Sequence, residues 1–250
     1  MCIPRLPLEL WERIGGWTHG NQQAAFSEDA EAGATLAREF SEHVKATLQT
    51  RRASGVDASD DITASLLTTE VNGEPPSDDD IVSILRTWTA GHGTIAAAIG
   101  ILTLYLAEHP DTQERLRAEP SLLPVAIEEI LRIDDPLVAN RRTTTRDVEI
   151  EGRTIPAGEH LSLMWIAANR DHEAFDDPYT ARFDRDPNAG LLFGAGIHKC
   201  LGAPLARLEM RIATEELLAR TSSIALAGHE PVRRGRYPTN GLLALTIRFT

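Results

Sequence analysis

The most informative stretch of the sequence is FGAGIHKCLG, residues 193–202, which is followed by an apolar pattern with helical spacing over residues 203–220. Its glycines allow tight backbone turns, and Pro204 is well tolerated in the first turn of a helix. Cys200 therefore lies at a helix N-terminus, where the helix dipole and unpaired N–H groups favour the thiolate form. A thiolate is the form of cysteine that binds a metal or attacks an electrophile.

Cys200 also has other interpretations. An inert buried residue is the usual state of a lone cysteine, but it leaves the glycines and His198 beside it unexplained. A zinc site would need four nitrogen or sulfur ligands at suitable spacing, and the sequence does not offer them. A thiol enzyme would use Cys200 as its nucleophile, although no oriented base is identifiable. This last alternative stays open beside a role as a metal ligand.

A second unusual stretch lies inside a long helical pattern. A capping signal at residues 77–80 starts a helix that the apolar spacing extends from about Asp78 to Ala107. Gly91 and Gly93 each cost about 1 kcal/mol relative to alanine in a helix interior. They mark either a close contact between helices or a place where the backbone opens to a flat ligand, with the Thr94 hydroxyl bonding a carbonyl one turn back.

The remaining periodicity indicates further helices and a few short strands. Helical spacing covers residues 8–14, 30–49, 62–69, 112–118 and 122–133. A period of two predicts strands at residues 148–152, 155–158 and 161–165. The segment 171–188 is too rich in Asp, Pro and charge for regular structure, so we expect a surface loop held by side chains. The sequence predicts a mainly α fold with small β-sheets, in a single domain over residues 1–250.

Composition limits the classes of partner. The net charge of −12 and the pI near 5.1 argue against nucleic acid or an anionic membrane surface, because both repel an excess of carboxylates. Cys2 and Cys200 are far apart in sequence, which argues against a disulfide framework and suits a reducing cytoplasm. No apolar run reaches the roughly 18 residues of a membrane span, and no basic segment followed by an apolar one opens the chain. We therefore expect a cytoplasmic protein.

Three motifs together resemble those of the cytochrome P450 family, in its soluble bacterial form. They are AGHGT at residues 90–94, EILR at residues 129–132 and FGAGIHKCLG at residues 193–202. They match the family's oxygen-binding I-helix motif, its K-helix motif and its haem-binding loop, in the family's order. Shorter similarities at residues 155–158, 167–171 and 201–209 extend the resemblance over nearly the whole chain.

The resemblance implies that Cys200 is the proximal thiolate of haem b, iron protoporphyrin IX, and is the metal ligand. The residues that would surround its sulfur are Phe193, Gly194, Gly196 and Gly202. Phe193 would pack beside the sulfur, and the glycines would let N–H groups approach it and tune the iron.

Two basic side chains are expected at the haem propionates in the same family. His198 and Arg142 take this role by resemblance, and Arg142 is preferred to Arg141 because of its spacing from Arg132. Both basic residues also have the plainer interpretation of a solvent-exposed charge.

The resemblance further implies a buried ionic cluster and a substrate pocket. Glu129 and Arg132 would join Arg185 in a structural triad that holds the loop before residue 193, although such a carboxylate–guanidinium pair is usually a solvated surface pair. The residues that match pocket-lining segments are Leu137, Val138, Ala139, Asn240 and Leu242. They are mostly apolar, so the expected substrate is partly apolar.

The function that the resemblance implies is that of a haem-thiolate monooxygenase. Such an enzyme activates O₂ to oxygenate a small organic substrate, with electrons from a ferredoxin or flavoprotein. The alternative is a truncated, inactive protein that binds haem or a partner. It is favoured because the chain begins near the family's E-helix, so the haem face would be open and the exposed apolar surface would favour self-association.

The I-helix motif departs from the family at one position. Gly93 stands where the family usually has Asp or Glu, so a carboxylate that would relay protons is missing. Thr94 remains as the catalytic hydroxyl, with Gly91 and Gly93 beside it. His92 points to a different helix face, so we do not expect it to replace the carboxylate.

Overall fold

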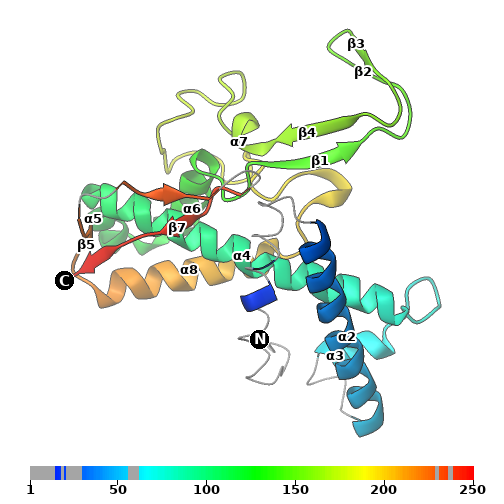
Figure 1. The fold of residues 1–250 in the computed structure, drawn as a ribbon. Coiled ribbons are helices and arrows are strands. Elements are labelled where there is room, and N and C mark those ends of the chain that lie inside the picture. The colour runs from blue at the N-terminus through cyan, green and yellow to red at the C-terminus, as the bar shows by residue number, and fades with distance from the viewer. Residues whose placement is uncertain (1–14, 18–19, 21–29, 56–61, 229–230, 236–238) are drawn as a thin grey trace. The chain divides into compact units, whose positions relative to one another are not determined.

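The computed structural model describes residues 15–17, 20, 30–55, 62–228, 231–235 and 239–250. The chain divides into two compact units, Met1–Gly93 and Thr94–Thr250. Helix α4, Asp78–Glu108, runs through the boundary between the units and closely matches the predicted span (Figure 1). The helix predicted at residues 8–14 lies outside the described residues, and the single domain over residues 1–250 stays a prediction.

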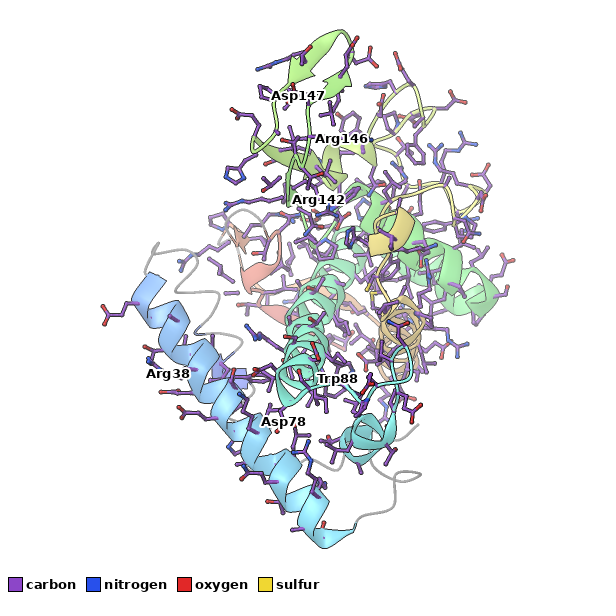
Figure 2. All side chains as sticks on the ribbon, turned by 90° about the vertical axis from the view of Figure 1, so that its right-hand side faces the viewer. Arg38, Asp78, Trp88, Arg142, Arg146 and Asp147 are labelled. Carbon is purple, nitrogen blue, oxygen red and sulfur yellow. The ribbon has the colours of Figure 1, made fainter. Side chains whose placement is uncertain are left out.

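The first unit pairs helix α2, Ala30–Ser54, with the short α3, Ile62–Thr68, and the beginning of α4. Its buried core consists of Phe40, Val44, Leu48, Ile81 and Val82. The four-residue spacing within α2 places its apolar residues on one face. At the start of α4 the backbone N–H of Asp80 donates to Ser77 Oγ at 3.2 Å, which is the expected cap. Arg52 forms an ion pair with Asp78, labelled in Figure 2.

The second unit has a helical core made by α4, α5 (Pro110–Ala118), α6 (Leu123–Ile133) and α8 (Ala203–Arg220), with the 3₁₀ turn η1 (Pro120–Leu122) before α6. The buried residues of α8 are Ala203, Ala206, Met210, Thr214 and Leu218. This repeat of three to four residues forms the stripe that packs on the core. The fully buried α6 residues Ile130 and Leu131 lie in the same cluster.

One side chain joins this helical core to a strand far along the chain. The Gln113 amide donates to the carbonyls of Leu106 at 2.6 Å and Ile224 at 2.8 Å, and its Oε1 accepts from the Ile224 N–H at 3.0 Å. Gln113 is 3% exposed, so these bonds satisfy an amide that burial would otherwise leave unpaired.

The strands form four small antiparallel pairs. They are β1 (Ala139–Thr143) with β4 (His160–Met164), β2 (Val148–Ile150) with β3 (Arg153–Ile155), β5 (Ile224–Leu226) with β8 (Ile247–Phe249), and β6 (Arg233–Arg234) with β7 (Leu242–Ala244). The first two pairs follow one another as a long ribbon (Figure 1). Its turn is at Glu151 and Gly152, which both have positive φ. The prediction of a mainly α fold with small sheets is confirmed.

The prediction that no unbroken apolar run reaches about 18 residues does not exclude α4 as a membrane-spanning helix by length and composition. This helix of 31 residues contains a window of mean hydropathy 1.5, long and apolar enough to cross a membrane by composition. A mean hydropathy over 18 residues stays high even though isolated Gly, Thr and His residues interrupt the apolar run. A buried core helix of a globular protein passes the same test. In α4, Ala98, Ile101, Leu102 and Leu106 lie in the core of the second unit, and 28% of the apolar window is buried.

Candidate functional site

The loop that carries Cys200 is folded by its own backbone hydrogen bonds. The N–H of Cys200 donates to the carbonyl of Phe193 at 2.9 Å, and the N–H of Gly194 donates to that of Leu191 at 2.9 Å. Gly194 and Gly196 both have φ of 69°, the left-handed conformation that favours glycine. The turn η2, Gly196–His198, then brings the chain to the N-terminus of α8.

This loop presents a thiol between two exposed apolar side chains. Cys200 is exposed, and the flanking Ile197 and Leu201 are 95% and 97% exposed. A Cβ on Gly202 would lie 3.8 Å from Cys200 Sγ, an ordinary van der Waals contact, so Gly202 lies directly beside the sulfur. In the described residues no group of three or more His, Cys, Asp or Glu could hold a metal ion. A single thiolate with apolar flanks suits an iron held in an apolar macrocycle, so these residues fit haem.

Phe193 anchors the loop to the helix that follows it. The guanidinium of Arg207 lies 4.4 Å from the centre of the Phe193 ring. Arg207 also donates from Nε to Glu128 Oε1 at 2.5 Å, which ties α8 to α6. The predicted contact of Phe193 with the Cys200 sulfur stays a prediction.

The strand β1 separates the two candidate propionate arginines. Alternate residues of a strand point to opposite faces, so Arg142 shares a face with Asn140, and Arg141 points the other way. Asn140 Oδ1 accepts a hydrogen bond from Trp165 Nε1 at 2.6 Å, and Trp165 Cζ2 lies 3.9 Å from a Cβ built on Gly194. Arg142, labelled in Figure 2, is therefore on the face that Trp165 links to the Cys200 loop. His198 lies in that loop and is exposed.

Glu129, Arg132 and Arg185 form one hydrogen-bonded cluster. Arg132 donates to both oxygens of Glu129, at 2.8 and 2.9 Å, and Arg185 Nε donates to Glu129 Oε1 at 3.0 Å. Arg132 NH1 also donates to the carbonyls of Asn169 at 2.5 Å and Pro178 at 2.9 Å. Glu129 and Arg132 are 4% and 3% exposed, so this pair is not a solvated surface pair. We call these three side chains the clamp.

The glycine stretch in α4 does not open the backbone. The helix is continuous from Asp78 to Glu108, so this part of the expectation was wrong. A Cβ on Gly91 would meet no described atom within 4 Å, which also excludes close packing of described residues there.

Thr94 differs from the other threonines of α4. Thr87, Thr89 and Thr103 each donate to a carbonyl three or four residues back, at 2.7 to 2.9 Å. The Thr94 side chain is exposed and makes no such bond among the described residues. The expected bond to the preceding turn is therefore absent, and the hydroxyl is available to a ligand.

The predicted pocket residues come from two segments that lie together. Leu137 forms an isolated antiparallel bridge with Thr239, and the N–H of Asn240 donates to the carbonyl of Pro136 at 3.0 Å. Val138 and Leu242 are partly buried, and Ala139 is buried at the start of β1.

Comparison with known proteins assigns the family. The family model for cytochrome P450 matches residues 14–233. The chain belongs to the cytochrome P450 family. A P450 of the bacillaene polyketide synthase of Bacillus subtilis has a TM-score of 0.90 at 30% identity, over 99% of this chain and 64% of that one. P450BioI, solved with an acyl carrier protein, has a TM-score of 0.89 at 31% identity and the same coverage.

Curated P450 relatives match a shorter part of the chain. The vitamin D(3) 25-hydroxylase of Pseudonocardia autotrophica is 47% identical over 139 residues, which are 55% of this chain and 34% of the relative. The biotin biosynthesis P450 of Bacillus subtilis is 40% identical over 160 residues, 64% of this chain and 40% of the relative. The chain thus spans between a third and two fifths of these relatives, and about two thirds of the P450 structures it resembles.

Two polar residues outside the predicted site connect the P450 clamp to the Cys200 loop. Asn169 is fully buried, and its Oδ1 accepts from the N–H of Leu191 at 2.6 Å, two residues before Phe193. Its Nδ2 donates to Asp135 Oδ2 at 3.2 Å. Burial raises the pKa of Asp135 to about 7, against the hydrogen bonds from the Leu137 N–H and Asn169. In the sequence, the acidic pair Asp134 and Asp135, directly before Pro136 and shortly after EILR, was the signal that could have pointed to Asp135.

Proposed function

We propose that this chain is the haem-binding part of a P450 monooxygenase, with Cys200 as the iron ligand. The observation that carries the proposal is the exposed thiol at the start of α8, framed by exposed Ile197 and Leu201. A helix N-terminus favours the thiolate that ligation requires. When bound, haem b would supply the chemistry that activates O₂.

The chain's own residues would hold and orient that group. The bond from the Cys200 N–H to the Phe193 carbonyl fixes the sulfur at the end of a closed loop. Arg142 and His198 would bind the two propionates, because guanidinium and imidazole N–H groups both donate hydrogen bonds to carboxylates. The clamp would hold the preceding loop through Asn169, whose side chain binds the backbone of Leu191.

Thr94 would handle protons at its Oγ1. This hydroxyl makes no internal hydrogen bond among the described residues, and position 93 offers no carboxylate. General acid–base assistance is typically worth about 10²–10⁴-fold, so slow turnover and loss of reducing power as hydrogen peroxide are expected. Gly93→Asp should raise the product formed per electron consumed, and Thr94→Ala should lower it. Equal ratios in the three proteins would refute a role for this stretch in proton delivery.

The proposed substrate is a small, partly apolar organic molecule, and the proposed electron donor is a ferredoxin or flavoprotein. The apolar side chains of Leu137, Val138 and Leu242 support the first part. The family supports the second, because P450 enzymes receive their electrons from a redox partner.

The deciding experiment is a haem titration followed by reduction and exposure to carbon monoxide. Thiolate ligation moves the main haem absorption band strongly to the red, so the unaltered chain should show this band and Cys200→Ser should not. Cys2→Ser, at the other cysteine of the sequence, is the control and should keep the band. Haem binding without the shifted band in any variant would support the inactive alternative, and an unchanged band in Cys200→Ser would refute the assignment of Cys200.

Self-association is the remaining proposal, and it rests on Ile197 and Leu201. Large exposed apolar side chains favour association with another surface. Light scattering and binding of an apolar dye should both decrease when haem is added. A monodisperse monomer without haem that binds no dye would contradict this proposal.

A further inference from the structure

Both carboxylate oxygens of Asp134 are bound by side chains of the C-terminal segment, which here means the described residues 231–235 and 239–242. Asp134 caps the C-terminus of α6, and Arg234 donates to it in a bidentate manner, from NH1 to Oδ1 at 2.9 Å and from NH2 to Oδ2 at 2.7 Å. Asn240 Nδ2 adds a bond to Oδ1 at 2.6 Å. Paired N–H donors on a carboxylate fix orientation as well as distance.

Backbone bonds attach the same segment to the residues after Asp134. Asn240 donates its N–H to the Pro136 carbonyl, and Asn240 Nδ2 also reaches the carbonyl of Asp135 at 3.1 Å. Residues 239–242, which we call the C-terminal turn, are thereby held on the end of α6. The clamp fixes the preceding turn of α6 in the core, so the end of α6 is a firm reference point.

The other side of the C-terminal turn lies against α4. A Cβ on Gly241 would come within 2.8 Å of Ala97 Cβ, and the side chain of Leu242 lies 3.7 Å from a Cβ built on Gly100. Ala97 is three residues after Thr94, so the two side chains share a face of the helix. The C-terminal turn therefore bounds the space next to the Thr94 hydroxyl.

We propose that Asp134 is a positioning residue that holds the C-terminal turn against α4 and so limits the size of the substrate that fits beside Thr94. The limit on substrate size rests on the proposed function, whereas the position of the turn does not. Asp134 and Arg234 are 22% and 38% exposed, and such partly solvated pairs contribute little to global stability. Loss of the pair should therefore move the C-terminal turn without unfolding the protein.

Hydrogen exchange tests the position of the turn without haem. The N–H of Gly235 donates to the carbonyl of Gly241 in the C-terminal turn at 2.6 Å. In Asp134→Asn the amides of Gly235 and Asn240 should exchange about tenfold faster, because local opening becomes easier. The amides of β5 and β8 should not change. Asp134→Glu, which keeps the carboxylate, should restore part of the protection.

Asp184→Asn is the matched control for the loss of a carboxylate. Asp184 also binds an arginine in a bidentate manner, Arg182, with distances of 3.2 and 2.8 Å. This variant should leave exchange at Gly235 and Asn240 unchanged. Unchanged exchange in Asp134→Asn, or equal acceleration in both variants, would overturn the proposal.

Azole ligands of increasing size test the effect on the pocket in the haem-loaded protein. The dissociation constants of imidazole and 4-phenylimidazole are read from the absorption shift. In Asp134→Asn the affinity for 4-phenylimidazole relative to imidazole should be several-fold higher than in the unaltered chain. Gly241→Ala, which pushes the turn away from Ala97, should move it the same way. An unchanged ratio in both variants would overturn the limit on size. If the unaltered chain gives no thiolate spectrum, the proposed function fails, and with it that limit, while exchange still decides whether Asp134 positions the turn.

Discussion

The clamp and the Cys200 loop satisfy their polar groups in opposite ways. Arg132 is buried, and its guanidinium is bound by a carboxylate, two carbonyls and the face of the Phe175 ring, 4.6 Å away. The loop closes its backbone bonds but leaves Cys200 exposed between apolar side chains. The polar groups of the clamp are bound by other protein groups, whereas the loop keeps a thiol and two large apolar side chains exposed. Substitutions in the clamp should therefore affect folding, and substitutions in the loop should affect haem binding.

The largest effect is expected from Arg132→Leu. It leaves the Glu129 carboxylate buried with one of its charge partners removed, which typically costs about 3–5 kcal/mol. Urea unfolding followed by circular dichroism measures the free energy of unfolding. Arg211→Leu, which removes an exposed pair with Glu215, is the control and should change it by less than about 0.5 kcal/mol. A similar small change for Arg132→Leu would remove the contrast between the two regions.

Asp135, which is linked to the clamp through Asn169, should make the stability of the fold depend on pH. Its pKa is about 7 in the fold and near 3.8 in the unfolded chain, so the folded state binds the extra proton between these values. Stability should fall as pH rises from about 4 to 7, by at most about 2–4 kcal/mol from this group, and stay low above pH 7. Asp134 raises this pKa and Arg170 lowers it.

The test of this dependence is the difference between the unaltered chain and Asp135→Asn. The free energy of unfolding, measured by urea from pH 5 to 8, should decline more steeply in the unaltered chain. Parallel pH profiles would show that Asp135 does not titrate in this range. The absolute stability of the variant is a separate matter, because its amide would face the Asn169 Nδ2 donor.

Gly194→Ala should have a smaller effect. A Cβ there would make only ordinary contacts, at 3.9 Å, but φ of 69° costs a non-glycine residue about 1–2 kcal/mol. Gly152→Ala is a matched control, with φ of 73° and open space around its Cβ. Both variants should lose similar stability, and only Gly194→Ala should weaken haem binding. Equal haem affinity would show that the loop tolerates the strain without moving Cys200.

Cys200→Ser should have the smallest effect on stability, below about 0.5 kcal/mol without haem, because an exposed thiol makes few contacts. Haem should raise the melting temperature of the unaltered chain and not that of the variant, since only a ligand that binds the folded state stabilises it. Equal stabilisation of both proteins would place haem elsewhere.

The sequence predicted the parts of the site that are local in the chain. Cys200 and its glycines lie within ten residues, and Glu129 and Arg132 lie one helical turn apart, so each set is a short motif whose resemblance to the family could be seen in the sequence. Both ends of Ala203–Arg220 were predicted correctly. Gly202 and Pro204 mark the start of this helix, and the apolar spacing continues to its end. Short-range patterns carry this information directly.

Contacts between distant segments could not be predicted in the same way. Arg234 and Asp134 are 100 residues apart, and either could equally be a solvated charge. Asn169 was part of a familiar segment, but its burial depends on Asp135 and Leu191, which lie on separate segments. The strand β1 was also missed, because its sequence ANRRT is polar and its strand character comes from pairing with β4.

The bonds of Gln113 have a consequence for the order of folding. This side chain binds the backbone of Ile224, 111 residues later, so the loop that must close between them is long. Closure of such a loop has an entropic cost that precedes the gain from its contacts, and non-local contacts slow folding. The turn from α4 to α5 is local and can form early, with the Gln113 amide still hydrated. Docking of β5 onto that amide is therefore expected to be a late step, visible as a slow phase that Gln113→Ala alters.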